Sequence, residues 1–214
     1  MLSMLSGTHT PQSVGTSPAG SQTGASTPAE THLEQIQHAP THPPTKPRKR
    51  IVVAMTGATG AILGIKATIK YETDYHPSNV RALADHIHNI NDMAAPISSG
   101  SFKTDGMIVV PCSMKTLAAI HSGFCDDLIS RTADVMLKER RKLVLVARET
   151  PLSDIHLRNM LEITRSGAII FPPVPAYYIR AASVDDLVDQ SVGRMLDLFE
   201  LDTGDFARWE GWEK

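Results

Sequence analysis

Four polar segments of this 214-residue chain carry residue types that could bind an anion and move a proton, and each follows a short apolar run. They are TGATGA (56–61), PCSMKT (111–116), ARETP (147–151) and PPVPAYY (172–178). Glycines let backbone N–H groups approach an anion closely, hydroxyl and guanidinium groups bind phosphate, and a carboxylate can accept a proton. Each segment alone has an ordinary explanation as a turn, a helix cap, a surface ion pair or a core tyrosine. Together they favour a binding site.

The apolar runs before these segments predict the strands that must position them. They are short and rich in β-branched residues: RIVVAM (50–55), GMIVVP (106–111), KLVLVA (142–147) and GAIIFP (167–172). Helical periodicity follows at 113–123, 126–141 and 183–201, and the last of these begins with Ser183 as the expected N-cap. The alternation predicts a doubly wound, mostly parallel α/β sheet of the Rossmann-like kind, with ligands outside the carboxyl ends of the strands.

Composition excludes several classes of protein. A formal net charge of −2 gives no general attraction to nucleic acid, and no apolar run approaches the length of about 20 residues that a membrane-spanning helix needs. Cys112 and Cys125 are too few for a disulfide framework and lack the spacing of a zinc site. The histidines have no ligand-like companions, and we expect His86 and His88 on a solvated helix. We predict no metal site.

The first 49 residues differ in composition from the rest. They are rich in Ser, Thr, Pro, Gly, Gln and His, and they end in basic residues. Such a composition buries too little apolar surface to offset the entropy of ordering, so it predicts a disordered tail. A Ser/Thr-rich, acid-poor segment is also typical of a mitochondrial presequence. We therefore predict a domain at 50–214 and a tail or presequence at 1–49, and a mitochondrial or otherwise cytoplasmic location.

The motifs occur in the order found in one family. TGATGA, YETD, ND-x-x-AP-x-x-SGS, PCSMKTLAAIHSGFCDDLISRTADVMLKERRKLVLVARETP, HLRNM and PPVPAYY together resemble the UbiX-type flavin prenyltransferases, also known as phenylacrylic acid decarboxylases. The resemblance extends from Arg50 to Trp209 and is closest to the fungal, mitochondrial members. It implies that a dimethylallyl group from dimethylallyl phosphate is joined to reduced FMN, at N5 and then C6. It also implies a homo-dodecamer and a UbiD-type decarboxylase that uses the product.

The resemblance assigns roles to individual residues. The implied FMN-binding residues are Gly57, Ala58, Thr59, Ser113, Met114, Lys115, Thr116 and Arg148. The implied clamp for dimethylallyl phosphate consists of Lys138, Tyr178 and Arg194, since two cations and a phenol can hold a phosphate dianion. Glu149 is the implied proton-transfer carboxylate, assisted by Thr59, with Glu72 lining the site.

The chain departs from the family after Gly64. Only Ile65 and Lys66 stand between Gly64 and the segment that begins at Ala67, where the family has a helix, a strand and a serine-bearing loop. With typical lengths of about 11 residues for a helix and 5 to 6 for a strand, roughly 20 residues are missing. The sequence therefore predicts that the first crossover helix and the second strand are absent, and that the flavin site lacks one wall.

Three other functions are compatible with parts of the sequence. A short-chain dehydrogenase also begins with TGATG, but Leu63 stands where its third glycine belongs, and no Tyr-x-x-x-Lys pair is present. A flavin-dependent cysteine-type decarboxylase shares the fold, and the KERR, ARETP and AYY segments favour the prenyltransferase over it. The third alternative is an inactive truncated variant.

Overall fold

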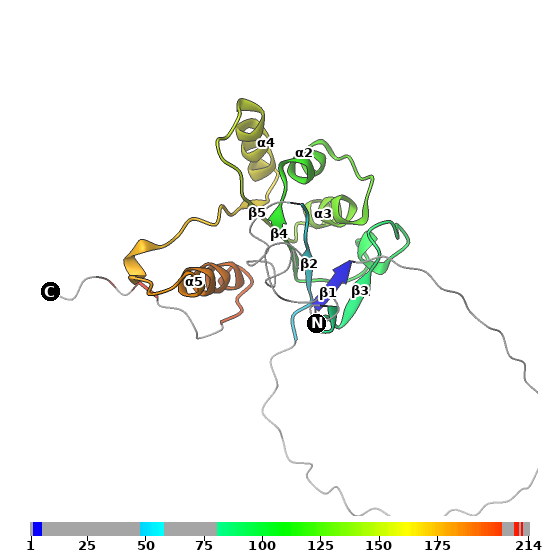
Figure 1. The fold of residues 1–214 in the computed structure, drawn as a ribbon. Coiled ribbons are helices and arrows are strands. Elements are labelled where there is room, and N and C mark those ends of the chain that lie inside the picture. The colour runs from blue at the N-terminus through cyan, green and yellow to red at the C-terminus, as the bar shows by residue number, and fades with distance from the viewer. Residues whose placement is uncertain (1, 6–47, 58–80, 203–207, 210, 212–214) are drawn as a thin grey trace, which may run out of the picture. The chain divides into compact units, whose positions relative to one another are not determined.

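The apolar runs form a parallel sheet in the computed structural model, which describes residues 2–5, 48–57, 81–202, 208, 209 and 211. Within these residues, the strands follow the order β3-β1-β2-β4-β5-β6, and every neighbouring pair is parallel (Figure 1). Their bounds are β1 (Leu2–Leu5), β2 (Ile51–Ala54), β3 (His86–His88), β4 (Gly106–Cys112), β5 (Lys142–Ala147) and β6 (Ile169–Ile170). The predicted doubly wound α/β class is confirmed.

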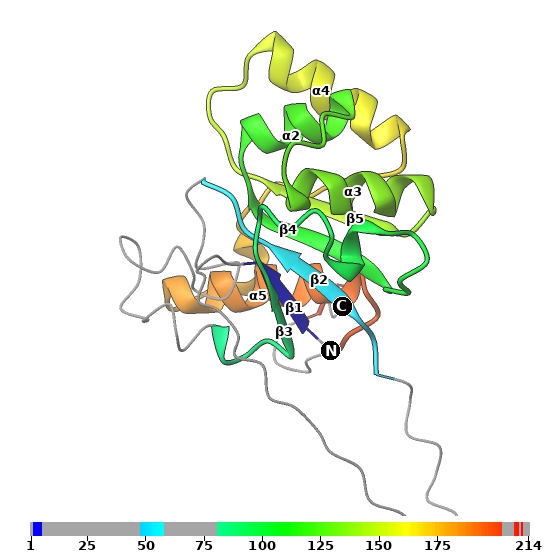
Figure 2. The same cartoon turned by 90° about the vertical axis from the view of Figure 1, so that its right-hand side faces the viewer.

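Helices cover both faces of the sheet. The helices α2 (Met114–Ser122), α3 (Leu128–Lys138) and α4 (Asp154–Arg165) lie on one face, and α5 (Val184–Asp197) lies on the other (Figure 2). Two short 3-10 helices, η2 (Pro96–Ser98) and η3 (Tyr177–Ile179), lie in the connections. None of the helices in the described residues has both the length and the apolar character that a membrane crossing requires.

The alternation of side chains along the central strands builds two cores. In β5, Leu143 and Leu145 pack into the core under α2, α3 and α4, whereas Val144 and Val146 pack into the core under α5. All four side chains are fully buried. Because successive strand residues point to opposite faces, a run such as KLVLV is apolar throughout when both faces are covered.

Side-chain caps fix where the helices begin. The Ser113 side chain accepts the Thr116 N–H at the start of α2, and Gly123 ends that helix in the left-handed conformation. Reciprocal capping boxes open α3, with Asp127 and Ser130, and α5, with Ser183 and Asp186. The predicted Ser183 cap is thus confirmed.

The strand β1 differs from the sequence-based expectation. We placed all of 1–49 outside the domain, but Leu2–Leu5 lies between β2 and β3 and pairs with both strands. The place in the sheet beside β2, on the side away from β4, is therefore occupied by β1, a segment that precedes β2 in the chain. The residues predicted to lack the crossover fall in 58–80, outside the described part, so the missing helix remains a prediction.

The segment around His86 and His88 is a strand instead of the solvated helix that we expected. It is only three residues long and pairs with β1. A strand this short carries too little periodicity to be distinguished from a helix turn. Its presence depends on a neighbour more than 80 positions away in the sequence, which local patterns cannot reveal.

Candidate functional site

The register of the sheet brings three of the predicted segments to one edge. Ala54 pairs with Val109, and Cys112 pairs with Ala147, so the residues that follow β2, β4 and β5 leave the sheet side by side. Gly57, Ser113 and Arg148 each stand within three residues of those strand ends. This edge is the carboxyl edge of a parallel sheet, where α/β proteins bind ligands.

The start of α2 offers hydroxyl and backbone groups at this edge. The Ser113 Oγ accepts the Thr116 N–H at 3.2 Å and lies 3.0 Å from the Thr116 Oγ1. Ser113 and Met114 are half-buried, Lys115 is exposed and Thr116 is buried. The first N–H groups of a helix have no intrahelical acceptors and carry partial positive charge. The segment 113–116 can therefore cap its helix and still present donors to a ligand.

The first turn is described only as far as Gly57. That residue is exposed, and a Cβ atom built on it would meet nothing within 4 Å, so the space beside the backbone is open. Ala58, Thr59 and Glu72 lie outside the described residues, and their assignments remain predictions. The residue before the turn, Thr56, hydrogen-bonds to the Pro111–Ser113 turn, a connection that the motif alone did not indicate.

The charged pair after β5 is exposed at the same edge. Arg148 directly follows Ala147, the last residue of β5, and Glu149 follows Arg148. The Glu149 Oε1 accepts the Thr150 N–H at 3.1 Å, which holds the carboxylate against its own turn. Both side chains are exposed where the chain leaves β5.

A second group of predicted residues gathers on α5. The Gln190 Nε2 donates to the Tyr178 hydroxyl at 3.2 Å, and Gln190 is only 5% exposed. Arg194, one turn further along α5, donates to the Asp197 Oδ2 at 2.9 Å. The structure therefore brings Tyr178 to α5, the helix that carries Arg194. Gln190 was not predicted, although its position four residues before Arg194 on an amphipathic helix was a usable signal.

The tail returns to this second group. The Trp209 ring meets the Tyr178 ring edge-on, with centroids 5.6 Å apart. Arg208 binds Asp197 through both of its terminal nitrogens, at 2.7 and 2.8 Å, and this contact is the main reason why the pKa of Asp197 lies below its ordinary value. A carboxylate at the last residue of a helix is opposed by the helix dipole, so two arginines compensate for its charge.

The third predicted clamp residue lies elsewhere in this chain. Lys138 ends α3, close before the first residue of β5, whereas Arg148 follows the last residue of that strand. The two residues thus lie at opposite ends of a six-residue strand, a span of about 20 Å. Lys138 pairs with Glu139. Lys138 is also carried by α3, which covers the opposite face of the sheet from α5, the helix that carries Arg194.

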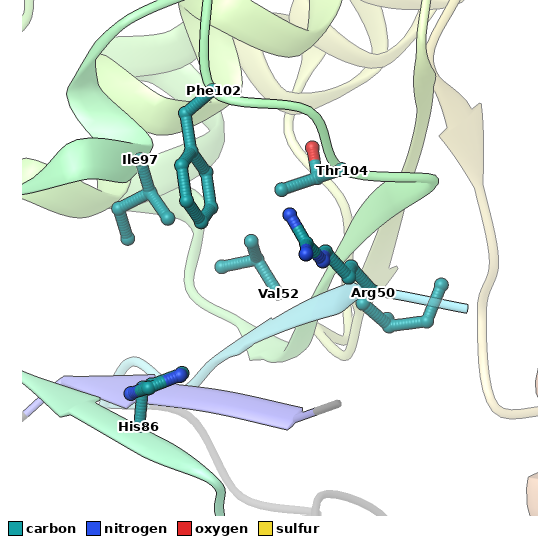
Figure 3. Close-up of a pocket in the computed structure, with 7 residues that line it drawn as sticks. Arg50, Val52, His86, Ile97, Phe102 and Thr104 are labelled. Atoms are coloured by element: carbon teal, nitrogen blue, oxygen red, sulfur yellow. The ribbon is translucent and has the colours of Figure 1, made fainter. Parts of the chain in front are cut away.

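Two hollows that are lined by described residues lie at the opposite, amino edge of the sheet. One is a cavity of about 10 Å³ lined by Arg50, Val52, His86, Ile97, Phe102 and Thr104, among others, and it has room for roughly one water molecule (Figure 3). The other has about 310 Å³ and borders Arg140, Lys142 and Gly167. Neither is lined by any of the predicted site residues.

The described residues include neither a reactive thiol at the end of β4 nor a cluster of metal ligands. Cys112 is buried at the end of β4, and burial raises the pKa of its thiol to about 12, which makes it an inert core residue. Among the described residues, no three His, Cys, Asp or Glu side chains come together as metal ligands would.

Fold and site together define a doubly wound α/β protein of the nucleotide-binding class. The sequence pattern of the flavoprotein family matches residues 65–196. The mitochondrial flavin prenyltransferase PAD1 of Saccharomyces cerevisiae is 57% identical over 184 residues, which covers 76% of each chain. The flavin prenyltransferase UbiX of Thauera aromatica is 49% identical over 186 residues, with 77% of this chain and 96% of that protein covered.

Solved structures of UbiX-type proteins resemble this chain in both sequence and fold. A crystal structure of AnUbiX (PadA1) in complex with FMN and dimethylallyl pyrophosphate is 78% identical, covers 78% of this chain and all of that chain, and has a TM-score of 0.76. The dodecameric FMN-dependent UbiX-like decarboxylase of Escherichia coli O157:H7 is 51% identical, covers 76% of this chain and all of its own, and has a TM-score of 0.73. The chain belongs to the UbiX-type flavin prenyltransferase family.

The comparison with the yeast protein also measures the shortfall in length. Since 76% of 214 residues is about 163, about 21 of the 184 aligned positions have no counterpart in this chain. That number is close to the roughly 20 residues expected for a helix, a strand and their turns. The placement of the gap after Gly64 is a prediction from the motifs.

Proposed function

We propose that this chain is a flavin prenyltransferase that joins the dimethylallyl group of dimethylallyl phosphate to reduced FMN, first at N5 and then at C6. The observation that carries the proposal is the meeting of Gly57, Ser113 and Arg148 at the carboxyl edge of the sheet, in a chain with such high identity to proteins of that activity. Reduced FMN supplies the nucleophile, and inorganic phosphate leaves with the electrons of the broken carbon–oxygen bond.

The described residues fit a flavin. The open space beside Gly57 admits a ligand close to the backbone, the α2 start provides donors, and Arg148 is an exposed cation at the same edge. In our proposal these groups bind FMN together with Ala58 and Thr59, and Met114, Lys115 and Thr116 complete the second segment. An apolar, water-poor site would keep the flavin, and not water, as the group that attacks.

Tyr178 and Arg194 are proposed to bind the phosphate. A phenol and a guanidinium form charge-assisted hydrogen bonds to a dianion, and these strengthen as negative charge develops on the departing phosphate. For this role Arg194 must turn from Asp197 to the ligand, and Arg208 then keeps Asp197 paired. Glu149 is proposed to accept the proton released at the flavin, assisted by Thr59 and Glu72.

We propose a homo-oligomer as the working form, a dodecamer like the Escherichia coli relative. In this proposal the Lys138 of the clamp comes from another copy, because within one chain α3 and α5 cover opposite faces of the sheet. Large apolar side chains also remain exposed on α4, where Leu157 and Leu161 are 52% and 51% exposed and follow each other by one helical turn. A second copy of the chain would cover them.

The proposed product, prenylated FMN, would be used by a UbiD-type decarboxylase. We propose a mitochondrial location, supported by the mitochondrial yeast relative and by the composition of residues 1–49. Import assays with a fluorescent fusion of residues 1–49 test the location. Restoration of decarboxylation in an assay that combines this chain with a UbiD-type enzyme tests the partner.

Substitution of Glu149 tests the catalytic assignment. We expect Glu149→Gln to retain FMN and lose most product formation, because an amide cannot accept the proton. The matched control is Glu162→Gln on α4, a surface carboxylate paired with Arg165, which should leave the yield unchanged. Product is measured by mass spectrometry of the extracted flavin.

Substitution of Arg194 tests the phosphate assignment. Arg194→Ala should raise KM for dimethylallyl phosphate and leave the Kd for FMN unchanged, whereas Arg158→Ala, which breaks an exposed pair with Asp154, should change neither. Equal loss of FMN binding in Arg194→Ala would contradict the phosphate role. Wild-type protein that binds FMN but transfers no dimethylallyl group would favour the inactive truncated variant.

A further inference from the structure

Thr56 connects the two turns to which we assign flavin binding. It stands between β2 and the glycine turn, and its side chain reaches the turn after β4. The Thr56 Oγ1 donates to the Pro111 carbonyl oxygen at 3.2 Å and accepts the Ser113 N–H at 2.8 Å. The Thr56 N–H donates to the same Pro111 oxygen at 3.1 Å. One half-buried residue thus makes three hydrogen bonds across the gap between the turns.

The connection continues into α2. Ser113, whose N–H is held by Thr56, is also the N-cap of α2, and its hydroxyl contacts both the N–H and the hydroxyl of Thr116. The position of Thr56 therefore sets the position of Ser113, and Ser113 sets the direction in which the first N–H groups of α2 point. These are groups that a ligand at the carboxyl edge would meet.

The geometry of β4 explains why this connection is needed. The pairing of β4 with β5 is regular up to Val109 and resumes at Cys112 with a shifted register. A bulge of this kind leaves backbone groups near Pro111 outside the regular ladder, and buried backbone groups need other partners. Thr56 supplies these partners from the segment that follows the neighbouring strand β2. A residue there with no hydroxyl could not serve the Ser113 N–H.

We propose that Thr56 is a positioning residue that fixes the spacing of the Gly57 turn and the Ser113–Thr116 turn for FMN. The proposal rests on the proposed function, since it takes FMN as the ligand of both turns.

Two variants of Thr56 test the proposal. Thr56→Val keeps the shape and removes the hydroxyl, and Thr56→Ser keeps the hydroxyl. We expect Thr56→Val to speed hydrogen exchange at the Ser113 amide. It should also raise the Kd for FMN about tenfold, which corresponds to the loss of one net hydrogen bond. Thr56→Ser should stay close to the wild type in the exchange rate and in the Kd. The matched control is Thr104→Val. The half-buried Thr104 hydroxyl contacts the Met136 sulfur at 3.6 Å and lies before β4, at the other edge of the sheet, so this variant should leave the Ser113 exchange rate and the Kd for FMN unchanged.

The outcomes separate the possibilities. Faster Ser113 exchange with unchanged FMN affinity would show a purely structural hydrogen bond and would overturn the positioning role. Unchanged Ser113 exchange in Thr56→Val would overturn the connection itself. A wild-type protein that binds no FMN would be a failure of the proposed function, and the positioning role for FMN would fail with it, whatever the Ser113 exchange rate.

Discussion

Removal of one hydroxyl from the proposed phosphate clamp should have a stability cost that can be worked out from the structure. In Tyr178→Phe, the Gln190 amide loses the acceptor that it now reaches at 3.2 Å. A buried donor left without a partner costs about 1–3 kcal/mol. Gln190 is 5% exposed but Tyr178 is 50% exposed, so water can enter where the hydroxyl was. We therefore expect the low end of that range, about 1 kcal/mol.

A double-mutant cycle measures this coupling. Gln190→Leu replaces the amide by an apolar group of similar size, and the Tyr178 hydroxyl can then turn to solvent. In the Gln190→Leu background, Tyr178→Phe should cost close to nothing, so the coupling free energy should be about 1 kcal/mol. Urea unfolding of the four proteins gives the values, and each kcal/mol should shift Tm by roughly 2–4 °C in a domain of this size.

If the free-energy costs of Tyr178→Phe and Gln190→Leu add up to the cost of the double mutant within about 0.3 kcal/mol, the two side chains do not share a hydrogen bond, and the expected coupling is wrong. Enzyme kinetics of Tyr178→Phe provide a test that does not depend on the unfolding data. Tyr178→Phe should raise KM for dimethylallyl phosphate and leave the Kd for FMN unchanged. A change in FMN affinity of the same size as the change in KM would place Tyr178 in the flavin site or in the fold.

Three further predictions follow from the described residues. Ser3→Pro removes a backbone N–H from β1, which pairs with β2 and β3, and should lower the free energy of unfolding by about 1–2 kcal/mol. The control Ser3→Ala keeps that N–H and should leave the free energy of unfolding unchanged. Equal unfolding curves for Ser3→Pro and the wild type would show that β1 does not belong to the sheet. Cys112 should react with a thiol reagent at pH 8 far more slowly in the native protein than in urea, because its pKa of about 12 keeps it protonated; equal labelling by peptide mass spectrometry would contradict its burial. Arg208→Gln should destabilise the protein at pH 7, where the Asp197 carboxylate is ionised. Since contact with Arg208 lowers the pKa of Asp197, this contribution is present above the ordinary Asp pKa and is lost as pH falls through the lowered one. A stability difference that persisted unchanged at acid pH would contradict the ion pair.

The sequence predicted the elements whose signals are local. Buried parallel strands read as apolar β-branched runs, so Ile51–Ala54 and Lys142–Ala147 could be located, and Ser183 marked the start of α5 by its capping chemistry. The chemistry of the carboxyl edge followed from the same patterns, because the residues after parallel strands must emerge together.

What the sequence could not reveal depends on distant pairing. The strand Leu2–Leu5 is four residues long within a polar segment, and only its neighbours β2 and β3 give it a place in the sheet. Lys138 was grouped with Arg194 by resemblance, and nothing local shows that its helix covers the opposite face of the sheet from α5. The contacts of Trp209 with Tyr178 and of Arg208 with Asp197 likewise join segments with no shared pattern.

The most direct test of the account is a single-turnover reaction of the purified chain with anaerobically reduced FMN and dimethylallyl phosphate, followed by mass spectrometry of the flavin. The same reaction is run on a version in which the predicted missing crossover is restored from the relatives. From the chain as it stands, we expect a flavin that is heavier by one dimethylallyl unit, together with release of inorganic phosphate. Unmodified FMN from this chain, beside prenylated FMN from the restored version, would contradict its activity as a flavin prenyltransferase.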